Sequence, residues 1–199
     1  MKKFQYITAI ISFVLFMTIA HFVFYEMEIS GEDYLLSNMS NLHFIELFSV
    51  IGTELVIGIA SIALILYLWW VKKDFIGIIT VVVLVAGSNV LNKAIKGLME
   101  RERPPFSHGE EGFSFPSGHA MVGLVFLLVI AYFISREITS TGMKVSLFIL
   151  AIILSLLTGL SRIVEQAHYP SDVAAGYLLG YSFFVLCIFL YEKRPKQER

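Results

Sequence analysis

Six long apolar runs decide what this 199-residue chain can fold into. They extend over Phe4–Phe24, Leu47–Val71, Phe75–Ile95, His119–Ser135, Val145–Leu160 and Val173–Tyr191. Runs of about 20 apolar residues suit helices that cross a bilayer, and none shows the period-two alternation of a membrane barrel. Hydrophobic residues make up 57% of the chain and charged residues only 16%. The sequence therefore predicts an all-α polytopic membrane protein with six transmembrane helices, in a single domain covering residues 1–199.

The basic residues orient the predicted bundle. Ten of the fifteen Lys and Arg residues fall at one set of helix ends, namely Lys2, Lys3, Lys72, Lys73, Arg136, Lys144, Lys193, Arg194, Lys196 and Arg199. Because cytoplasmic loops are enriched in Lys and Arg, we expect this face and both termini to be cytoplasmic. The other basic residues then lie on the outer face, where a functional role would explain them: Lys93, Lys96, Arg101, Arg103 and Arg162.

Three features outside the motifs have alternative interpretations. The first run resembles a signal peptide, but its apolar stretch exceeds the usual core of roughly 7–15 residues, so we expect a retained helix. The stretch from Glu26 to Glu46 is either a short interfacial helix or an ordinary loop. Cys187 is the only cysteine and lies in an apolar run, so we expect a small buried hydrophobe.

The first of three polar segments follows the third run. Lys96 and Arg103 are separated by six residues, and Pro104 comes next. As the helix gives way to a loop, the two cations could hold a tetrahedral anion from two sides. Taken alone, the pair is better explained as interfacial anchors at a helix end.

The second segment is the turn Pro116-Ser117-Gly118-His119. Ser117 is a natural N-cap for a helix that begins near His119, and the free N–H groups of a helix start favour phosphate. Once a bound phosphate offsets the helix dipole, His119 could donate a proton to a leaving oxygen. A simple helix cap is the alternative.

The third segment contains Ser161, Arg162, His168 and Asp172. Arg162 adds a third cation, and Asp172 is close enough in sequence to accept the Nδ1–H of His168. That arrangement leaves Nε2 free as a nucleophile or base. Pro170 argues against a regular helix through this stretch, and Asp172 could instead only stabilise the start of the last helix.

Together the segments resemble the signature of the type 2 phosphatidic acid phosphatase superfamily. That signature is matched at Lys96, Arg103, Pro104, Pro116, Ser117, Gly118, His119, Ser161, Arg162, His168 and Asp172, over residues 96–172. The resemblance implies that His168 attacks phosphorus and forms a phosphohistidine, Asp172 orients it, and His119 protonates the departing oxygen. It implies these phosphate ligands: Lys96, Arg103, Ser117, Gly118 and Arg162. Glu102 and Ala167 stand where Pro and Gly are frequent in the family.

The expected protein is a lipid phosphate phosphatase that needs no metal or cofactor, acting on the outer face of a bacterial plasma membrane. Three cations already supply the charge stabilisation that phosphoryl transfer requires. The chain also lacks a concentrated carboxylate or histidine set for two metals. The expected reaction converts phosphatidylglycerophosphate to phosphatidylglycerol, and undecaprenyl diphosphate is the alternative substrate. The lipid and the bilayer are the expected partners, with no nucleic acid and an open oligomeric state.

Other functions and residues fit less well. An anionic-lipid transporter would hold its cargo near mid-membrane at broken helices, whereas these residues lie at helix ends. A phosphatase for soluble substrates and a vanadate haloperoxidase are weaker alternatives. Glu54, inside the second run, faces either the site or a polar helix contact, and Gly176-x-x-x-Gly180 is expected to pack internally. The remaining histidines are expected to be structural or solvated: His21, His43 and His108.

Overall fold

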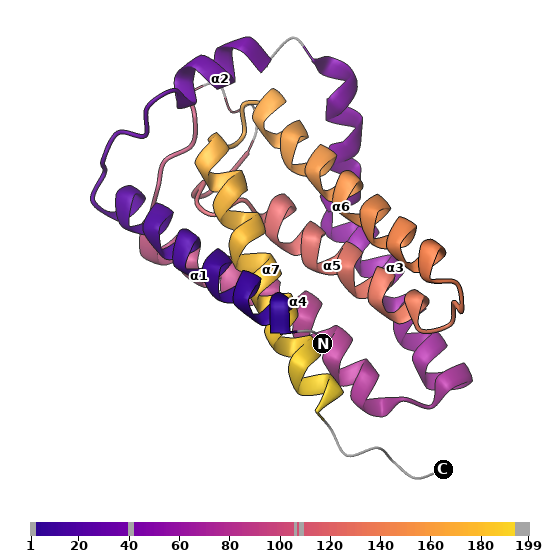
Figure 1. The fold of residues 1–199 in the computed structure, drawn as a ribbon. Coiled ribbons are helices and arrows are strands. Elements are labelled where there is room, and N and C mark those ends of the chain that lie inside the picture. Colours follow the sequence, from indigo (N-terminus) through magenta and orange to yellow (C-terminus); the bar gives the residue numbers. More distant parts are fainter. Residues whose placement is uncertain (1–2, 40–41, 106, 108–109, 194–199) are drawn as a thin grey trace.

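The computed structural model describes residues 3–39, 42–105, 107 and 110–193, and it is a bundle of helices (Figure 1). In chain order the elements are α1 (Lys3–Phe24), α2 (Glu32–Met39), the 3₁₀-helix η1 (His43–Gly52), α3 (Glu54–Tyr67), the π-helix η2 (Leu68–Lys72), α4 (Phe75–Met99), α5 (Gly118–Ser135), α6 (Thr141–Val164) and α7 (Pro170–Glu192). Six helical segments are long and apolar enough to cross a membrane, η2 continuing α3 in one of them. No strand occurs in these ranges. The predicted all-α fold with six spans is confirmed.

The second span is shorter than its apolar run. The run Leu47–Val71 is broken where η1 ends at Gly52 and Thr53 takes an extended conformation, with φ −71° and ψ 147°. The Thr53 side chain then caps α3 by accepting from Val56 N at 3.5 Å. The prediction of a span from Leu47 was therefore wrong, because hydropathy alone does not register a capped helix start inside an apolar run.

Glu54 begins α3, so it lies at the start of the second span and not inside it as the apolar run suggested. Its Oε1 is 3.4 Å from Nζ of Lys93 on α4, and both side chains are largely exposed. Of the two interpretations of Glu54, the structure supports the polar contact between helices.

α5 is the central helix, in contact with α4, α6 and α7 (Figure 1). Its Met121 and Val125 are fully buried. A Cβ atom on Gly176 of α7 would lie 2.8 Å from the Ser117 carbonyl oxygen, and one on Gly180 would lie 2.8 Å from the Met121 carbonyl oxygen. Because only glycine permits so close an approach, Gly176-x-x-x-Gly180 packs inside the bundle, as predicted.

α1 packs along α7 and forms one wall of the bundle (Figure 1). Ser182 Oγ donates to the Ala9 carbonyl at 2.9 Å, and Thr8 Oγ1 lies 2.9 Å from the Tyr181 hydroxyl. On α7, Cys187 is buried in the core, as predicted. Retention of the first helix in the mature protein stays a prediction.

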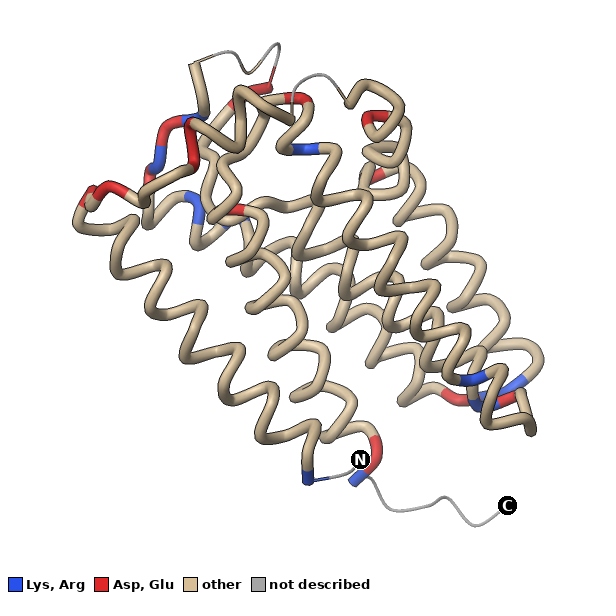
Figure 2. The backbone as a smooth tube through the Cα atoms, turned by 45° about the horizontal axis from the view of Figure 1, so that its top comes forward, with Lys and Arg blue, Asp and Glu red and all other residues tan. Residues whose placement is uncertain are grey.

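Consecutive long helices run in alternating directions, so their ends gather at two faces of the bundle (Figure 2). One face carries the described members of the basic set, at these helix ends: Lys3, Lys72, Lys73, Arg136, Lys144 and Lys193. Lys2, Arg194, Lys196 and Arg199 lie outside the described residues. The opposite face, hereafter the motif face, carries α2, η1 and the loop between α4 and α5. Which face is cytoplasmic stays a prediction.

The segment between α1 and α3 contains the short helix α2, which contacts α6 and α7 on the motif face. Leu36 of α2 packs into a buried cluster with Ala120, Ile163 and Val173. Tyr34 on the same helix is 70% exposed. The stretch contains a short helix and is not a plain loop, because Leu36 and the buried Glu32 give α2 an inward face. The interfacial position of this helix stays a prediction.

Candidate active site

Four helix ends bring the three motif segments together on the motif face. Lys96 lies in the last turn of α4, Arg162 in the last turn of α6, Ser117 and His119 at the start of α5, and Asp172 in the first turn of α7. Helices α4 and α6 both continue past the apolar runs that predicted them, to Met99 and Val164. Regular helix therefore holds most of these side chains.

The turn between α6 and α7 places His168. The amides of Ala167 and His168 both donate to the Arg162 carbonyl, at 3.0 and 3.2 Å, and Gln166 takes a left-handed φ of 53°. Pro170 then occupies the first position of α7, where its missing N–H has no intrahelical partner to lose. As Pro170 predicted, no regular helix runs through this stretch: α6 ends at Val164, and α7 begins at Pro170.

His168 lies between Asp172 and Arg103. Its Nδ1 is 3.6 Å from Asp172 Oδ2, and its Nε2 is 3.3 Å from Nη1 of Arg103. Because a guanidinium only donates, Nε2 must be the acceptor, and the ring proton sits on Nδ1 facing Asp172. Burial lowers the pKa of His168 to about 4, although Asp172 attracts a proton to it. The imidazole is therefore neutral at pH 7, with the lone pair of Nε2 directed at Arg103.

Asp172 is fully buried and held by several bonds. Its Oδ2 accepts from the Tyr169 amide at 2.9 Å, which caps the start of α7. Its backbone carbonyl accepts from the Ser117 amide at 3.0 Å and so joins the starts of α7 and α5. The Asp172 carboxylate therefore has both of the expected contacts: it stabilises the start of α7, and it faces His168.

Lys96, Arg103 and Arg162 border the same region. Lys96 Nζ donates to the Phe113 carbonyl at 2.6 Å, and Arg103 Nε donates to the Gly112 carbonyl at 2.9 Å. The Arg162 side chain is 5% exposed and the Arg103 side chain 8%. The loop between α4 and α5 thus orients two of the three cations through its backbone.

A carboxylate that the sequence did not single out lies between the two arginines. Glu110 Oε1 accepts from Nη2 of Arg162, and its Oε2 lies 3.5 Å from Nη2 of Arg103. Burial opposes the charge of Glu110, but Arg162 and then Arg103 hold its pKa below the usual range. Arg162 also donates to Glu165. The arginine pair therefore holds one two-oxygen anion jointly.

Asn92 of α4 supports the Pro-Ser-Gly-His turn. Its Nδ2 donates to the Pro116 carbonyl at 3.0 Å, and its Oδ1 would lie 3.2 Å from a Cβ on Gly118. Ser117 caps α5 as predicted, its Oγ accepting from the Ala120 amide at 3.5 Å. Asn92 therefore joins α4 to the turn through a buried polar contact. Phosphate binding by Ser117 and Gly118 stays a prediction.

His119 stands in the first turn of α5 against η1. A Cβ on Gly52 would lie 2.5 Å from Cδ2 of His119 and 2.8 Å from Cγ2 of Thr158. Because Gly52 has no side chain, the imidazole of His119 occupies space that a larger residue at position 52 would fill. The role of His119 as an acid stays a prediction.

Arg101 and Glu32 lie beside Asp172, and neither is part of the motif. Arg101 Nη1 donates to Asp172 Oδ1 at 2.7 Å, and its Nη2 donates to Glu32 Oε2 at 2.8 Å. The only signal in the sequence was the position of Arg101 on the predicted outer face. Glu32 had no signal, since it was one of several acids in an external stretch.

Among the described histidines, His21 and His43 form no hydrogen bond, ion pair or ring contact with these residues. His43 Nδ1 lies 2.9 Å from Glu46 Oε1 and its side chain is 77% exposed, while the His21 ring contacts Tyr25 edge-on at 4.7 Å. Both agree with structural or solvated roles, and His108 lies outside the described residues. Within the described ranges, no group of three or more His, Cys, Asp or Glu side chains is placed to hold a metal ion.

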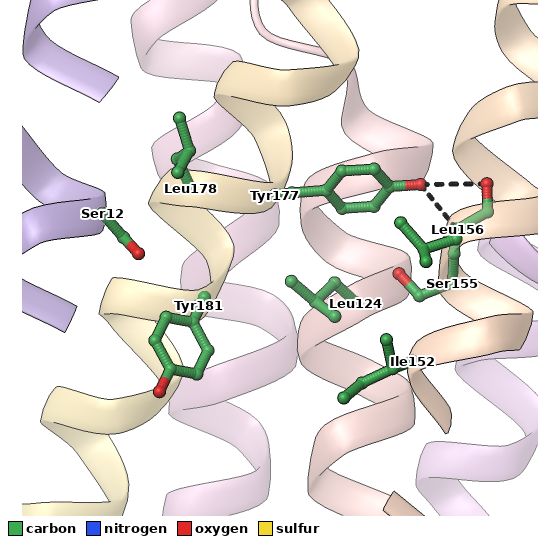
Figure 3. Close-up of a pocket in the computed structure, with 8 residues that line it drawn as sticks. All are labelled: Ser12, Leu124, Ile152, Ser155, Leu156, Tyr177, Leu178 and Tyr181. Atoms are coloured by element: carbon green, nitrogen blue, oxygen red, sulfur yellow. Dashed lines mark hydrogen bonds between the residues drawn. The ribbon is translucent and has the colours of Figure 1, made fainter. Parts of the chain in front are cut away.

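An apolar pocket of about 250 Å³ lies between α1, α5, α6 and α7 (Figure 3). It is lined by Ser12, Leu124, Ile152, Ser155, Leu156, Tyr177, Leu178 and Tyr181. None of these eight side chains is charged, and the Tyr177 hydroxyl donates to the Ser155 carbonyl at 2.6 Å. Leu124 follows His119 by five residues on α5, about 7.5 Å along the helix axis. The pocket suits a hydrocarbon chain and not a phosphate.

Comparison with known proteins identifies the family. Residues 77–196 match the profile of the PAP2 superfamily. The chain belongs to the PAP2 superfamily. The resemblance expected from the spaced motif residues is thereby confirmed, and the PAP2 protein is a multi-pass membrane protein.

Individual relatives extend the comparison. Phosphatidylglycerophosphatase B of Bacillus subtilis (strain 168) is 35% identical to this PAP2 protein over 123 residues, which is 60% of each chain. The lipid A 1-phosphatase of Rhizobium etli is 31% identical over 118 residues, 53% of this chain and 47% of that protein. The chain thus matches less than two thirds of the length of either relative. The crystal structure of a transmembrane PAP2 type phosphatidylglycerolphosphate phosphatase from Bacillus subtilis shares the fold, with a TM-score of 0.82, 23% identity and coverage of 96% of this chain and 99% of that chain.

Proposed function

We propose that this PAP2 protein is a lipid phosphate phosphatase that removes the terminal phosphate of phosphatidylglycerophosphate to give phosphatidylglycerol. The observation that carries the proposal is His168, a buried neutral imidazole whose Nε2 faces Arg103 while Nδ1 faces Asp172. A neutral imidazole held this way is an activated nucleophile beside an anion-binding group. The substrate follows from the relative that is 35% identical and is named a phosphatidylglycerophosphatase.

In the first step, Nε2 of His168 attacks phosphorus. A P–N bond forms, the P–O bond to the lipid breaks, and His119 gives its proton to the departing lipid oxygen. Asp172 stabilises the Nδ1–H as the imidazole becomes cationic. The product of this step is a phosphohistidine and the free lipid alcohol.

In the second step, water attacks the phosphohistidine. The P–N bond breaks, inorganic phosphate leaves, and the proton of the water returns to His119. The phosphate oxygens are assigned to Lys96, Arg103, Ser117, Gly118 and Arg162. Positioning and charge stabilisation by such groups account for most of the catalysis of phosphoryl transfer, so neither step is assigned a metal.

A lipid substrate agrees with the position of these residues at helix ends on one membrane face. The apolar pocket along α5 would take part of a hydrocarbon chain while the phosphate reaches His168. The motif residues bind phosphate and not the tail, so undecaprenyl diphosphate is the second candidate substrate. Transport is disfavoured, because mid-membrane sites at broken helices are its usual setting.

We place the motif face on the outside of a bacterial plasma membrane, with both termini cytoplasmic. This orientation is supported by the Lys and Arg residues gathered at the opposite helix ends (Figure 2).

Phosphate release from defined lipids tests this function. Purified protein in lipid micelles with EDTA is expected to release phosphate from phosphatidylglycerophosphate faster than from undecaprenyl diphosphate, with His168→Ala as the blank. The reverse preference would assign the enzyme to the second substrate. Release from neither lipid would contradict the proposal and favour transport.

Replacing Glu110 is expected to strengthen inhibition by phosphate analogues. Because Glu110 bridges Arg162 and Arg103, it competes with any anion that both arginines bind. In Glu110→Gln, the inhibition constant of orthovanadate and the KM for the lipid are expected to fall about two- to fivefold, as for a partly exposed ion pair. The neighbouring exposed acid provides a matched control, Glu111→Gln, which is expected to change neither. Weaker vanadate inhibition in Glu110→Gln would mean that Glu110 helps to build the site.

A further inference from the structure

We propose that Arg101 and Glu32 are positioning residues for the nucleophile: with Asp172 they form a buried carboxylate–guanidinium–carboxylate bridge that fixes the oxygen facing His168. The bridge links α2, the loop after α4 and the start of α7. The inference deepens the proposed function and rests on it.

Both terminal nitrogens of the Arg101 guanidinium donate hydrogen bonds. Its Nη1 donates to Asp172 Oδ1 at 2.7 Å and to Ser171 Oγ at 2.7 Å, and its Nη2 donates to Glu32 Oε2 at 2.8 Å. Its Cζ atom lies 4.1 Å from the centre of the Tyr169 ring, an arrangement that adds a cation–π contact. A planar fork can join two carboxylates in this way, whereas the point charge of a lysine cannot.

The bridge is shielded from solvent. The side chains of Asp172, Glu32 and Arg101 are 0%, 10% and 18% exposed. Burial opposes the charge of Arg101, but the attraction of Asp172 and then Glu32 outweighs it and raises the pKa of Arg101. Removing one member of such a buried set leaves a buried charge without compensation, which strongly destabilises the arrangement.

The two oxygens of Asp172 have separate tasks. Oδ1 accepts from Arg101, while Oδ2 accepts from the Tyr169 amide and faces His168. With Oδ1 held, the carboxylate cannot rotate Oδ2 away from the imidazole. Without Arg101, Asp172 would both lose this anchor and attract a proton to His168 more strongly, so less of the enzyme would carry the neutral nucleophile.

Glu32 fixes the other end of the bridge. Its Oε1 accepts from the Ser171 amide at 2.9 Å, one of the first amides of α7, which have no intrahelical acceptor. One turn later on α2, Leu36 packs against residues of α5, α6 and α7. Glu32 therefore holds Arg101 from a helix that is itself anchored on the motif face.

The charged groups around His168 and Asp172 come from every neighbouring element: Lys96 of α4, Arg101 and Arg103 of the following loop, His119 of α5, Arg162 of α6 and Glu32 of α2. Of these, Arg101 and Glu32 have no part in the assigned phosphate site. Their removal is therefore expected to change the nucleophile and not the binding of a phosphate analogue.

The test compares Arg101→Gln, Arg101→Lys and Glu32→Gln with the wild type and with His168→Ala. For Arg101→Gln we expect kcat to fall about 100-fold, with KM and orthovanadate inhibition within about twofold of the wild type. In the wild type, protonation of His168 is expected to set the acid limb of the pH–kcat profile near its pKa of about 4. In Arg101→Gln this limb is expected to move up by about one pH unit or more, because a cation beside Asp172 is lost.

Conservative variants and a matched control sharpen the test. Arg101→Lys keeps the charge but not the bridge, so its kcat is expected to lie between those of Arg101→Gln and the wild type. Glu32→Gln is expected to lower kcat about tenfold, since one anchor of Arg101 remains. Asp33→Asn removes the same charge from the adjacent, exposed residue of α2 and is expected to leave kcat unchanged.

The outcomes separate the inference from the proposed function. A wild type that releases no phosphate refutes the function and the inference with it. An active wild type with unaltered kcat and acid limb in folded Arg101→Gln overturns the inference alone. If Arg101→Gln does not fold, Arg101→Lys and Glu32→Gln decide through kcat, because a purely structural role would lower the melting temperature and leave the kcat of the folded variant unchanged.

Discussion

Replacing His168 with alanine is expected to lower phosphate release by about 10⁴-fold or more, the scale of losing a catalytic nucleophile. The imidazole is the group whose Nε2 faces Arg103, and no P–N bond can form without it. Reactions with labelled substrate, quenched in alkaline detergent, should contain base-stable, acid-labile phosphoprotein in the wild type and none in His168→Ala. Retained orthovanadate binding in the variant would show that the phosphate site is intact.

The exposed His43 offers a matched control for this prediction. His43→Ala also removes an imidazole from the motif face, and this variant is expected to keep wild-type turnover. Full activity in folded His168→Ala would contradict the mechanism, and a phosphoprotein that persists in the variant would place the nucleophile elsewhere.

The six spans could be predicted because hydropathy is a local property that helices in lipid must satisfy. The helix ends could not be predicted as well. α6 continues through Ser161 and Arg162, where the sequence turns polar, because the ladder of backbone bonds does not end with the apolar run. The break after Gly52 was missed for the opposite reason: close packing against His119 and Thr158 interrupts a segment that remains apolar.

The site shows the same division between local and distant contacts. His168 and Asp172 could be paired from their spacing, since four residues at a helix start leave few geometries. The pairing of Arg101 with Asp172 joins residues 71 positions apart, and that of Glu32 with the Ser171 amide joins residues 139 positions apart. No local pattern encodes such contacts. They arise because α2 packs on α6 and α7, which only the assembled bundle defines.

Replacing His119 with alanine is expected to slow the hydrolysis of alkyl phosphates and that of aryl phosphates to different degrees. If His119 protonates the departing oxygen, its loss should lower the rate of phosphohistidine formation from a lipid phosphate by about 10²–10⁴-fold. With p-nitrophenyl phosphate the same step should change far less, because nitrophenolate leaves without a proton. Stopped-flow measurement of nitrophenolate and quenched-flow measurement of lipid alcohol give the two rates directly.

The aryl substrate also separates the two proposed steps in His119→Ala. Because water would lose the group that accepts its proton, the second step should become slow after a rapid first step. The variant is therefore expected to release one nitrophenolate per enzyme in a burst and then to accumulate phosphohistidine at His168. Gly52 packs against the His119 ring, so the variant opens space and leaves the backbone uncrowded. Equal losses with both substrates and no burst would instead assign His119 to substrate binding.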